Sequence, residues 1–200
     1  MTLGYATVGA ANRLYPEMFE HEIREPFGMH DTVLDIEQFL PERVAVGYRR
    51  DGKPLAFRGV GFNSTAPDML RFVEANLFRP RAMPPLSVRA MSLAHQPRFQ
   101  ISATRSIGMI WYTDQVGDGV HIVQKAGGNG GFVAWIGLLP EKAAAVVLLC
   151  NGHPVKGGPS IIQTGEEILC RATGLPIPLA SIKHPIEHPD GGIQEDDADA

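Results

Sequence analysis

The sequence predicts a mixed α/β fold of the α+β type, in which a C-terminal helix packs on an antiparallel sheet. Three apolar runs of strand length, residues 120–123, 132–139 and 143–150, follow one another with short polar or glycine-rich links. Runs of this kind, bounded by turn residues, are typical of strands. A helical pattern over residues 158–172 comes next and ends at Thr173-Gly174.

The links between the three runs predict how the strands pair. Pro140-Glu141-Lys142 is short enough to make the second and third runs an antiparallel hairpin. The third run is nearly continuous in small and branched apolar residues, as expected of a strand covered on both faces. The first link follows Lys125 and carries four glycines around Asn129 (Gly127, Gly128, Gly130 and Gly131). Glycine permits positive φ and close backbone approach, so we expect a glycine-rich turn here.

The earlier part of the chain predicts mostly helices. Residues 3–14 suit a buried helix, and a second helix begins at Pro16 and ends at Gly28-Met29. Ser64 or Thr65 is expected to cap a third helix, and residues 84–94 form a fourth.

Extended structure is predicted in two further places. Residues 44–49 and 54–57 read as a surface hairpin around Asp51-Gly52, and residues 106–113 as one strand. Trp111 and Trp135 are expected to pack on a sheet face.

Composition indicates one soluble domain, residues 1–182, followed by a disordered acidic tail, residues 183–200. Of the 200 residues 44% are hydrophobic and 20% charged, and the net charge is -4. The absence of a basic excess argues against nucleic acid as a partner. No apolar run approaches the roughly 20 residues that a membrane span needs. Cys150 and Cys170 lie in apolar contexts and are expected to be buried thiols, with a disulfide neither required nor excluded.

Lys125 and the glycines after it have two interpretations. A cation on a strand edge beside bare backbone could dock an anionic ligand group. The alternative is a glycine-rich turn with a solvated lysine, which spacing alone favours.

The residues Q-K-A-G-G-N-G-G-F, followed by L-P-E-K and an apolar run, resemble the K-T-G box of the serine β-lactamase and penicillin-binding protein superfamily. The resemblance is closest to class C β-lactamases and to AmpH-type D-Ala-D-Ala carboxypeptidase/endopeptidases. It implies that Lys125 helps to hold a substrate carboxylate and that the Gly128 N–H donates to the oxyanion, with Gly127 beside them. Ala126 stands where the family has threonine, so one hydroxyl contact is absent.

Other segments extend this resemblance over most of the chain. L-G-Y-A-T-V-G and P-F-G-M-H-D-T are similar to the family segment after its Y-x-N motif, which places Thr2 at the asparagine and the tyrosine before Met1. G-F-N-S-T-A-P-D-M is similar to a family helix start, and Gly108 to Trp111 matches the family's G-L-G-W loosely. The resemblance implies a partial β-lactamase/transpeptidase-like fold with a remnant of the helical subdomain.

A hydrolase of this family needs S-x-x-K, in which lysine shares the proton of the serine hydroxyl. The nearest spacing here is Ser102-Ala103-Thr104-Arg105, and arginine cannot act as the base. The seven histidines have no H-E-x-x-H or C-x-x-C companion, so neither a metal nor another cofactor is predicted. Glu166-Glu167 is interpreted as a solvated helix face.

These observations predict the C-terminal portion of a β-lactamase-related serine hydrolase that is inactive alone. Its partner would be a peptidoglycan-like peptide or a β-lactam if the site were completed. The alternatives are a non-catalytic module that binds peptidoglycan-like carboxylates, and a gene fragment without function that associates through an exposed sheet edge. The family is periplasmic, but no signal peptide precedes Leu3, so the chain as written would be cytoplasmic. Lactamase, carboxypeptidase, endopeptidase and esterase activities remain open.

Overall fold

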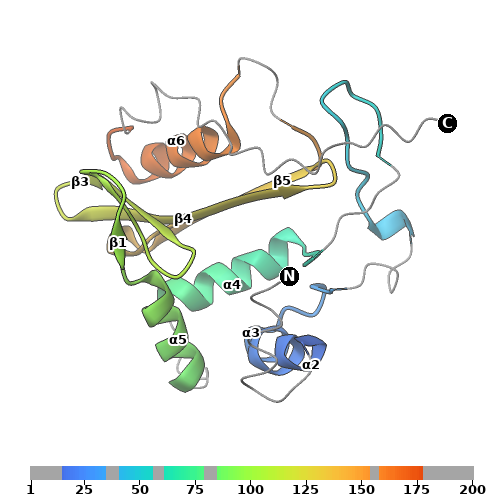
Figure 1. The fold of residues 1–200 in the computed structure, drawn as a ribbon, viewed down its shortest axis with the longest axis horizontal. Helices are drawn as coiled ribbons and strands as arrows, with labels where there is room; N and C mark the ends of the chain where they lie inside the picture. The colour runs from blue at the N-terminus through green and yellow to red at the C-terminus, as the bar shows by residue number, and fades with distance from the viewer. Residues whose placement is uncertain (1–14, 35–40, 56–60, 79–84, 154–157, 178–200) are drawn as a thin grey trace.

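The computed structural model describes residues 15–34, 41–55, 61–78, 85–153 and 158–177. Its centre is a six-stranded antiparallel sheet in which the strands follow chain order, β1-β2-β3-β4-β5-β6. The strands are β1 Phe99–Gln100, β2 Arg105–Ile107, β3 Tyr112–Gly117, β4 Val120–Asn129, β5 Phe132–Leu139 and β6 Ala144–Cys150. Helix α6 (Ile161–Thr173) covers one face and α4 (Ala66–Phe78) lies on the other (Figure 1). The predicted fold class is confirmed.

The remaining helices lie on the α4 side of the sheet in Figure 1. α5 (Pro85–His95) matches the fourth predicted helix, and two 3₁₀ turns, η3 (Pro41–Arg43) and η4 (Pro140–Lys142), are links. The second predicted helix is one continuous run, α2 (Tyr15–Phe19), the π-helical η1 (Glu20–Arg24) and α3 (Glu25–Phe27). Pro26 lacks an N–H and crowds the carbonyl four residues earlier, which accounts for the wider π turn. Gly28, at φ 65°, ends the helix where predicted.

Two apolar clusters fill the space on either side of the sheet. Trp135 and Ile122 pack with Leu169 beneath α6, whereas Trp111, Ile136 and Leu138 pack with α4. Both tryptophans therefore lie on a sheet face, as predicted. Both faces of β6 also contribute, through Val146 toward α6 and Val147 toward α4. Alternate side chains of one strand point to opposite faces, so the two helices bury both halves of each apolar run.

Helix α6 approaches the sheet closely because glycine lies at the contact. A Cβ on Gly165 of α6 or on Gly137 of β5 would overlap the Trp135 indole ring. The helix begins with a capping box, in which the Ser160 hydroxyl accepts from the Gln163 N–H and the Gln163 side chain accepts from the Ser160 N–H. Gly174 ends it in the left-handed conformation.

Strand β4 differs from its prediction. It runs on through the glycines to Asn129, pairing Gly127 with Ala134 and Gly128 with Val133. The turn consists of Gly130 and Gly131 alone, at φ 55° and 79°, as a two-residue type I′ turn requires. Glycine can be extended wherever a neighbouring strand provides hydrogen bonds, so most of the supposed loop belongs to the sheet.

Three other predictions are wrong or only partly realised. Residues 106–113 do not form one strand, because a turn at 108–111 separates β2 from β3. The surface hairpin is reduced, in its described part, to a single bridge between Tyr48 and Pro54. Cys150 is exposed at the end of β6, whereas Cys170 is buried as predicted, and both thiols are free.

Several predictions fall outside the described residues. These are the helix at 3–14, the position of Thr2 and the tail from residue 183. Within the described part, no helix is both long enough and apolar enough to cross a bilayer.

Ile110 has a backbone conformation that a β-branched residue rarely adopts. Its φ is 79°, and its side chain is 57% exposed, so burial does not offset the strain. It stands at the position of the second glycine in the family's G-L-G-W pattern, which Gly108 to Trp111 resembles.

We therefore expect Ile110→Gly to stabilise the fold by about 1 kcal/mol, because glycine removes the left-handed strain. Gly119 at φ 69° provides the reciprocal control, since Gly119→Ala introduces such strain in open space and should destabilise. Urea unfolding followed by circular dichroism measures both. A lower midpoint for Ile110→Gly than for the parent would contradict the expectation.

Candidate functional site

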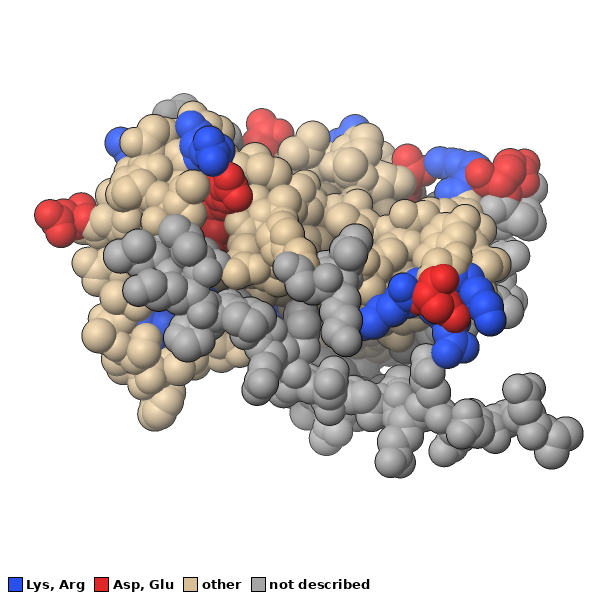
Figure 2. Space-filling view, turned by 90° about the horizontal axis from the view of Figure 1, so that it is seen from above, with Lys and Arg blue, Asp and Glu red and all other residues tan. Residues whose placement is uncertain are grey.

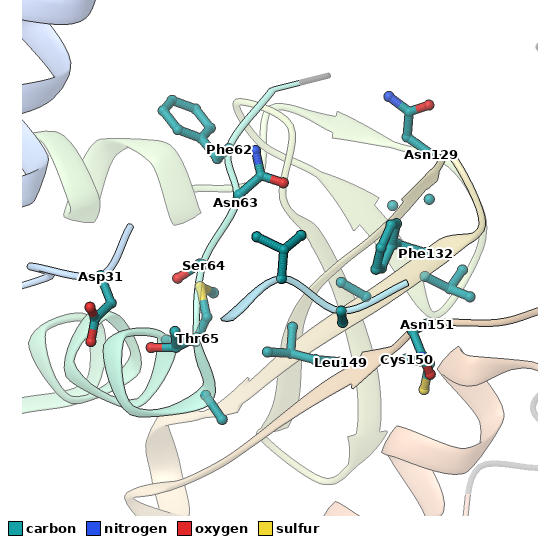
Figure 3. A pocket seen from close by; sticks show the side chains of 18 of the residues that line it. Asp31, Phe62, Asn63, Ser64, Thr65, Asn129, Phe132, Leu149, Cys150 and Asn151 are labelled. Carbon is teal, nitrogen blue, oxygen red and sulfur yellow. The ribbon is translucent and has the colours of Figure 1, made fainter. Parts of the chain in front are cut away.

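A cavity lies between the ends of β4, β5 and β6 and the N-terminus of α4. Its volume is about 800 Å³. Figure 3 shows Asn63, Ser64 and Thr65 on the segment that enters α4, facing the strands that carry Phe132 and Leu149. Gly127 and Gly128 line the strand side, and Val44 and Ala45 also line the cavity. The cavity is therefore formed by segments far apart in the sequence.

The α4 wall is held by Asp68, which is 1% exposed. Its carboxylate accepts hydrogen bonds from the Asp31 N–H and the Thr32 hydroxyl, both at 2.8 Å, and pairs with Arg71 at 2.9 Å. Thr65 caps the helix by accepting from the Asp68 N–H at 3.4 Å. Ser64 instead shares a 2.8 Å hydrogen bond with the Thr32 hydroxyl. The segments M-H-D-T and S-T-A-P-D, which both resemble the family, thus bond to each other and together fix the start of α4.

The strand wall has an open backbone edge. β3 pairs with β4 only as far as Gln124, and beyond it β5 is the one described strand beside β4. A two-residue type I′ turn closes on a hydrogen-bonded pair, here Asn129 and Phe132, and the pairs then alternate. Gly128 and Ala126 consequently direct their N–H and C=O groups away from β5. This is the orientation that an oxyanion donor at Gly128 requires.

Residues 46–48 hold the turn that joins β4 to β5. The Tyr48 N–H donates to the carbonyl of Asn151 at 3.0 Å and to that of Gly131 at 3.4 Å. The Asn151 side chain donates to the Val46 carbonyl at 2.9 Å. Gly47 packs against Gly130 so closely that a Cβ would overlap its carbonyl oxygen. The Gly130-Gly131 turn is therefore fixed by the chain at 46–48.

Lys125 and Ala126 do not line the cavity, unlike Gly127 and Gly128. The Lys125 ammonium lies 5.3 Å from the centre of the Tyr112 ring, and the Arg105 guanidinium carbon lies 5.6 Å from the same ring. Both distances are within the range of a cation–π contact. The structure thus brings Lys125 close to Tyr112, and the two glycines close to the α4 wall.

Gln124, directly before Lys125, belongs to a buried polar network under α6. Its amide donates to Asp114 at 2.6 Å and to Glu166 at 2.8 Å, and it accepts from the Trp135 indole at 2.6 Å. Arg105 donates two hydrogen bonds to Asp114. The bond to Asp114 raises the pKa of Arg105 above its ordinary value.

The network corrects the prediction that Glu166-Glu167 forms a solvated face. Glu166 is 4% exposed and points inward, while Glu167 pairs with Arg171 on the surface. Burial, and secondarily the neighbouring Glu166, raise the pKa of the Cys170 thiol. Sequence reasoning assigned no role to Gln124, which merely precedes Lys125 in the K-T-G-like segment, or to Asp114, which belongs to no motif.

Within the described residues, no group of three or more His, Cys, Asp or Glu side chains could hold a metal ion. The charges visible in Figure 2 are of mixed sign and scattered, without a broad basic field of the kind that nucleic acid binding requires.

The chain belongs to the beta-lactamase family, since the family model described as Beta-lactamase matches residues 1–163. It is 26% identical over 171 residues to the D-alanyl-D-alanine-carboxypeptidase/endopeptidase AmpH of Escherichia coli, covering 76% of this chain and 43% of that protein. It is 21% identical over 184 residues to a beta-lactamase of Pseudomonas fluorescens, covering 74% and 51%. The chain thus spans about half the length of these relatives.

Solved structures show the same fold. The octameric penicillin-binding protein homologue from Pyrococcus abyssi has a TM-score of 0.70 at 20% identity, covering 86% of this chain and 40% of that chain. A class C beta lactamase from Rhodobacter sphaeroides has a TM-score of 0.66 at 23% identity, covering 76% and 54%.

The Gln124 network yields a stability prediction. Gln124→Met keeps the side-chain length but leaves the Trp135 N–H and two carboxylates without their amide partner. Unsatisfied buried groups cost about 1–3 kcal/mol each, so we expect a loss of about 2–4 kcal/mol in unfolding free energy. Gln115→Met, on the exposed face of β3, is the matched control and should change little. Equal urea midpoints for the two variants would show that the network contributes no stability.

Proposed function

We propose that this chain provides the substrate-binding side of a serine acyl-transfer site and does not turn over substrate alone. The observation that carries the proposal is the open edge of β4, where Ala126 and Gly128 present outward N–H groups beside the cavity. An extended peptide can pair with such an edge, and an outward N–H can donate to a developing oxyanion. The ligand class that fits is a D-Ala-D-Ala peptide or a β-lactam.

Lys125 is proposed to interact with the ligand carboxylate. Its ammonium lies 5.3 Å from the Tyr112 ring centre, so it must leave the ring or receive the ligand there. Ala126 offers no hydroxyl where the K-T-G pattern has one, which removes one hydrogen bond to ligand. The proposed affinity therefore rests on backbone groups and one flexible cation.

The lack of turnover follows from the reacting groups. No serine in the sequence is followed three residues later by lysine, and no Y-x-N motif occurs. Loss of the nucleophile in a serine hydrolase costs about six orders of magnitude in rate. In the described wall, the Ser64 hydroxyl is bonded to Thr32 and the Thr65 hydroxyl caps α4.

Two alternatives to this proposal are a non-catalytic binding module and a chain without function. A non-catalytic module would hold peptidoglycan-like carboxylates without hydrolysis. A chain without function would show neither ligand binding nor a cooperative unfolding transition. Saturable binding of a D-Ala-D-Ala peptide supports the first, and aggregation through an unpaired sheet edge supports the second.

We expect that a fluorescent penicillin will not label this chain covalently, because acylation requires an activated serine. Denaturing gel electrophoresis after incubation, with an active penicillin-binding protein as positive control, measures the label. A labelled band that excess unlabelled penicillin removes would contradict the proposal.

We expect Lys125→Met to weaken the binding of N-acetyl-D-Ala-D-Ala about fivefold to tenfold, because one charge-assisted contact to its carboxylate is lost. Lys142→Met, on the exposed η4 turn, is the matched control and should bind as the parent does. An NMR titration gives both dissociation constants. Equal weakening in the two variants would show that only net charge matters.

A further inference from the structure

An exposed apolar surface lies at the β1 edge of the sheet, at the end opposite the β4–β5 turn (Figure 1). It consists of Phe99, Ile101, Met109 and Ile110, which are 69%, 48%, 55% and 57% exposed, and we call it the β1-edge patch. Apolar side chains of this size are rarely gathered in the open without a binding role.

Backbone contacts hold the parts of the patch together. Ile101 follows β1 directly, and its N–H donates to the Arg105 carbonyl of β2 at 2.9 Å. Phe99 pairs with Ile107 of β2, which leads directly into the turn that carries Met109 and Ile110. The Met109 N–H donates to the Ala94 carbonyl of α5 at 3.1 Å. The patch is therefore a defined surface of the fold.

The turn that presents Ile110 is strained and tightly packed. Ile110 lies at φ 79°, and a Cβ on Gly108 would approach the carbonyls of Ala94 and Gln96 to 2.6 and 2.7 Å. Strain in a bulky residue that gains little burial indicates a role outside the folded core. Here the strain directs a branched apolar side chain into solvent.

The segment of the sequence that carries the patch is basic. Residues 75–113 contain no Asp or Glu but five arginines, in a chain whose net charge is -4. Arg98 is exposed directly before Phe99, and Arg89 is exposed on α5. Asp114, the acidic residue that follows this segment, is paired with Arg105.

We propose that the β1-edge patch binds the surface of an anionic lipid bilayer. Phe99, Ile101 and the Met109-Ile110 turn enter the boundary between headgroups and acyl chains. Arg98 then pairs with lipid phosphates, since exposed apolar side chains combined with basic groups favour anionic interfaces. The cavity, at the other end of the sheet, stays accessible. This inference does not depend on the proposed acyl-transfer site.

Co-sedimentation of the full 200-residue chain with vesicles tests the proposal. We expect binding to vesicles of equal parts phosphatidylcholine and phosphatidylglycerol, weaker binding to pure phosphatidylcholine, and a loss on adding salt. Arg98→Glu should lower the partition coefficient about tenfold. The matched control is Arg50→Glu, which makes the same charge change at an exposed arginine of the surface turn outside the patch and should bind as the parent does.

The apolar contribution has its own matched pair. The double change Phe99→Ser and Ile101→Ser should lower binding about tenfold. Leu70→Ser, which alters a 57% exposed leucine on α4, should not. Circular dichroism confirms that each variant is folded, and Lys125→Met should bind vesicles normally.

Three results would overturn the proposal. Arg98→Glu and Arg50→Glu could weaken vesicle binding equally, which would indicate only bulk charge. The parent could fail to sediment with either vesicle. Analytical ultracentrifugation could show a dimer that the Phe99 and Ile101 changes abolish, which would make the patch an interface between copies of this chain.

Discussion

The buried hydrogen bonds of Gln124 are the constraint on which the sheet and the site depend. One amide connects β3 through Asp114, β5 through the Trp135 indole and α6 through Glu166. A slip of β4 by one residue would turn Gln124 to the α4 face and remove its hydrogen bonds to all three partners. The network therefore fixes which residues of β4 face α6 and which face α4, in a sheet whose apolar strands alone would tolerate other registers.

The geometry of the cavity wall follows from that register. Gln124 fixes β4 at the point where β3 ends, and the Gly130-Gly131 turn fixes the other end against the chain at 46–48. Between these two points, alternation leaves Ala126 and Gly128 with outward backbone groups. Glycine at 127 and 128 keeps side chains out of the edge. The site is thus a stretch of β4 that is unpaired on one side and fixed at both ends, by Gln124 and by the Gly130-Gly131 turn.

The elements that could be predicted from sequence are those in which the spacing of apolar residues matches the repeat of a helix or a strand. β5 has the predicted bounds, β6 begins one residue later, and α6 ends at Gly174 as expected. The glycines of β4 carry no side-chain pattern, so only pairing with β5 reveals that they form strand. Glu166 is buried against Gln124, which donates a hydrogen bond to it but lies 42 residues earlier in the sequence. No local pattern encodes a contact between residues so far apart. The cavity unites the 62–66 segment with β4–β6, and only the tertiary fold brings them together.

The arrangement of hydroxyls is one of the grounds for proposing that the cavity binds a ligand without turning it over. A nucleophilic serine needs a neighbouring base that accepts its proton. Ser64 instead faces the Thr32 hydroxyl, whose other partner is the Asp68 carboxylate, and that carboxylate is already shared with Arg71 and the Asp31 N–H. Every group in this series of hydrogen bonds helps to hold the start of α4. If Ser64 acted as a nucleophile, its hydrogen bond to Thr32 would be lost and the start of α4, which forms the cavity wall, would be held less firmly. Ser64 is therefore suited to a structural role and not to that of the nucleophile.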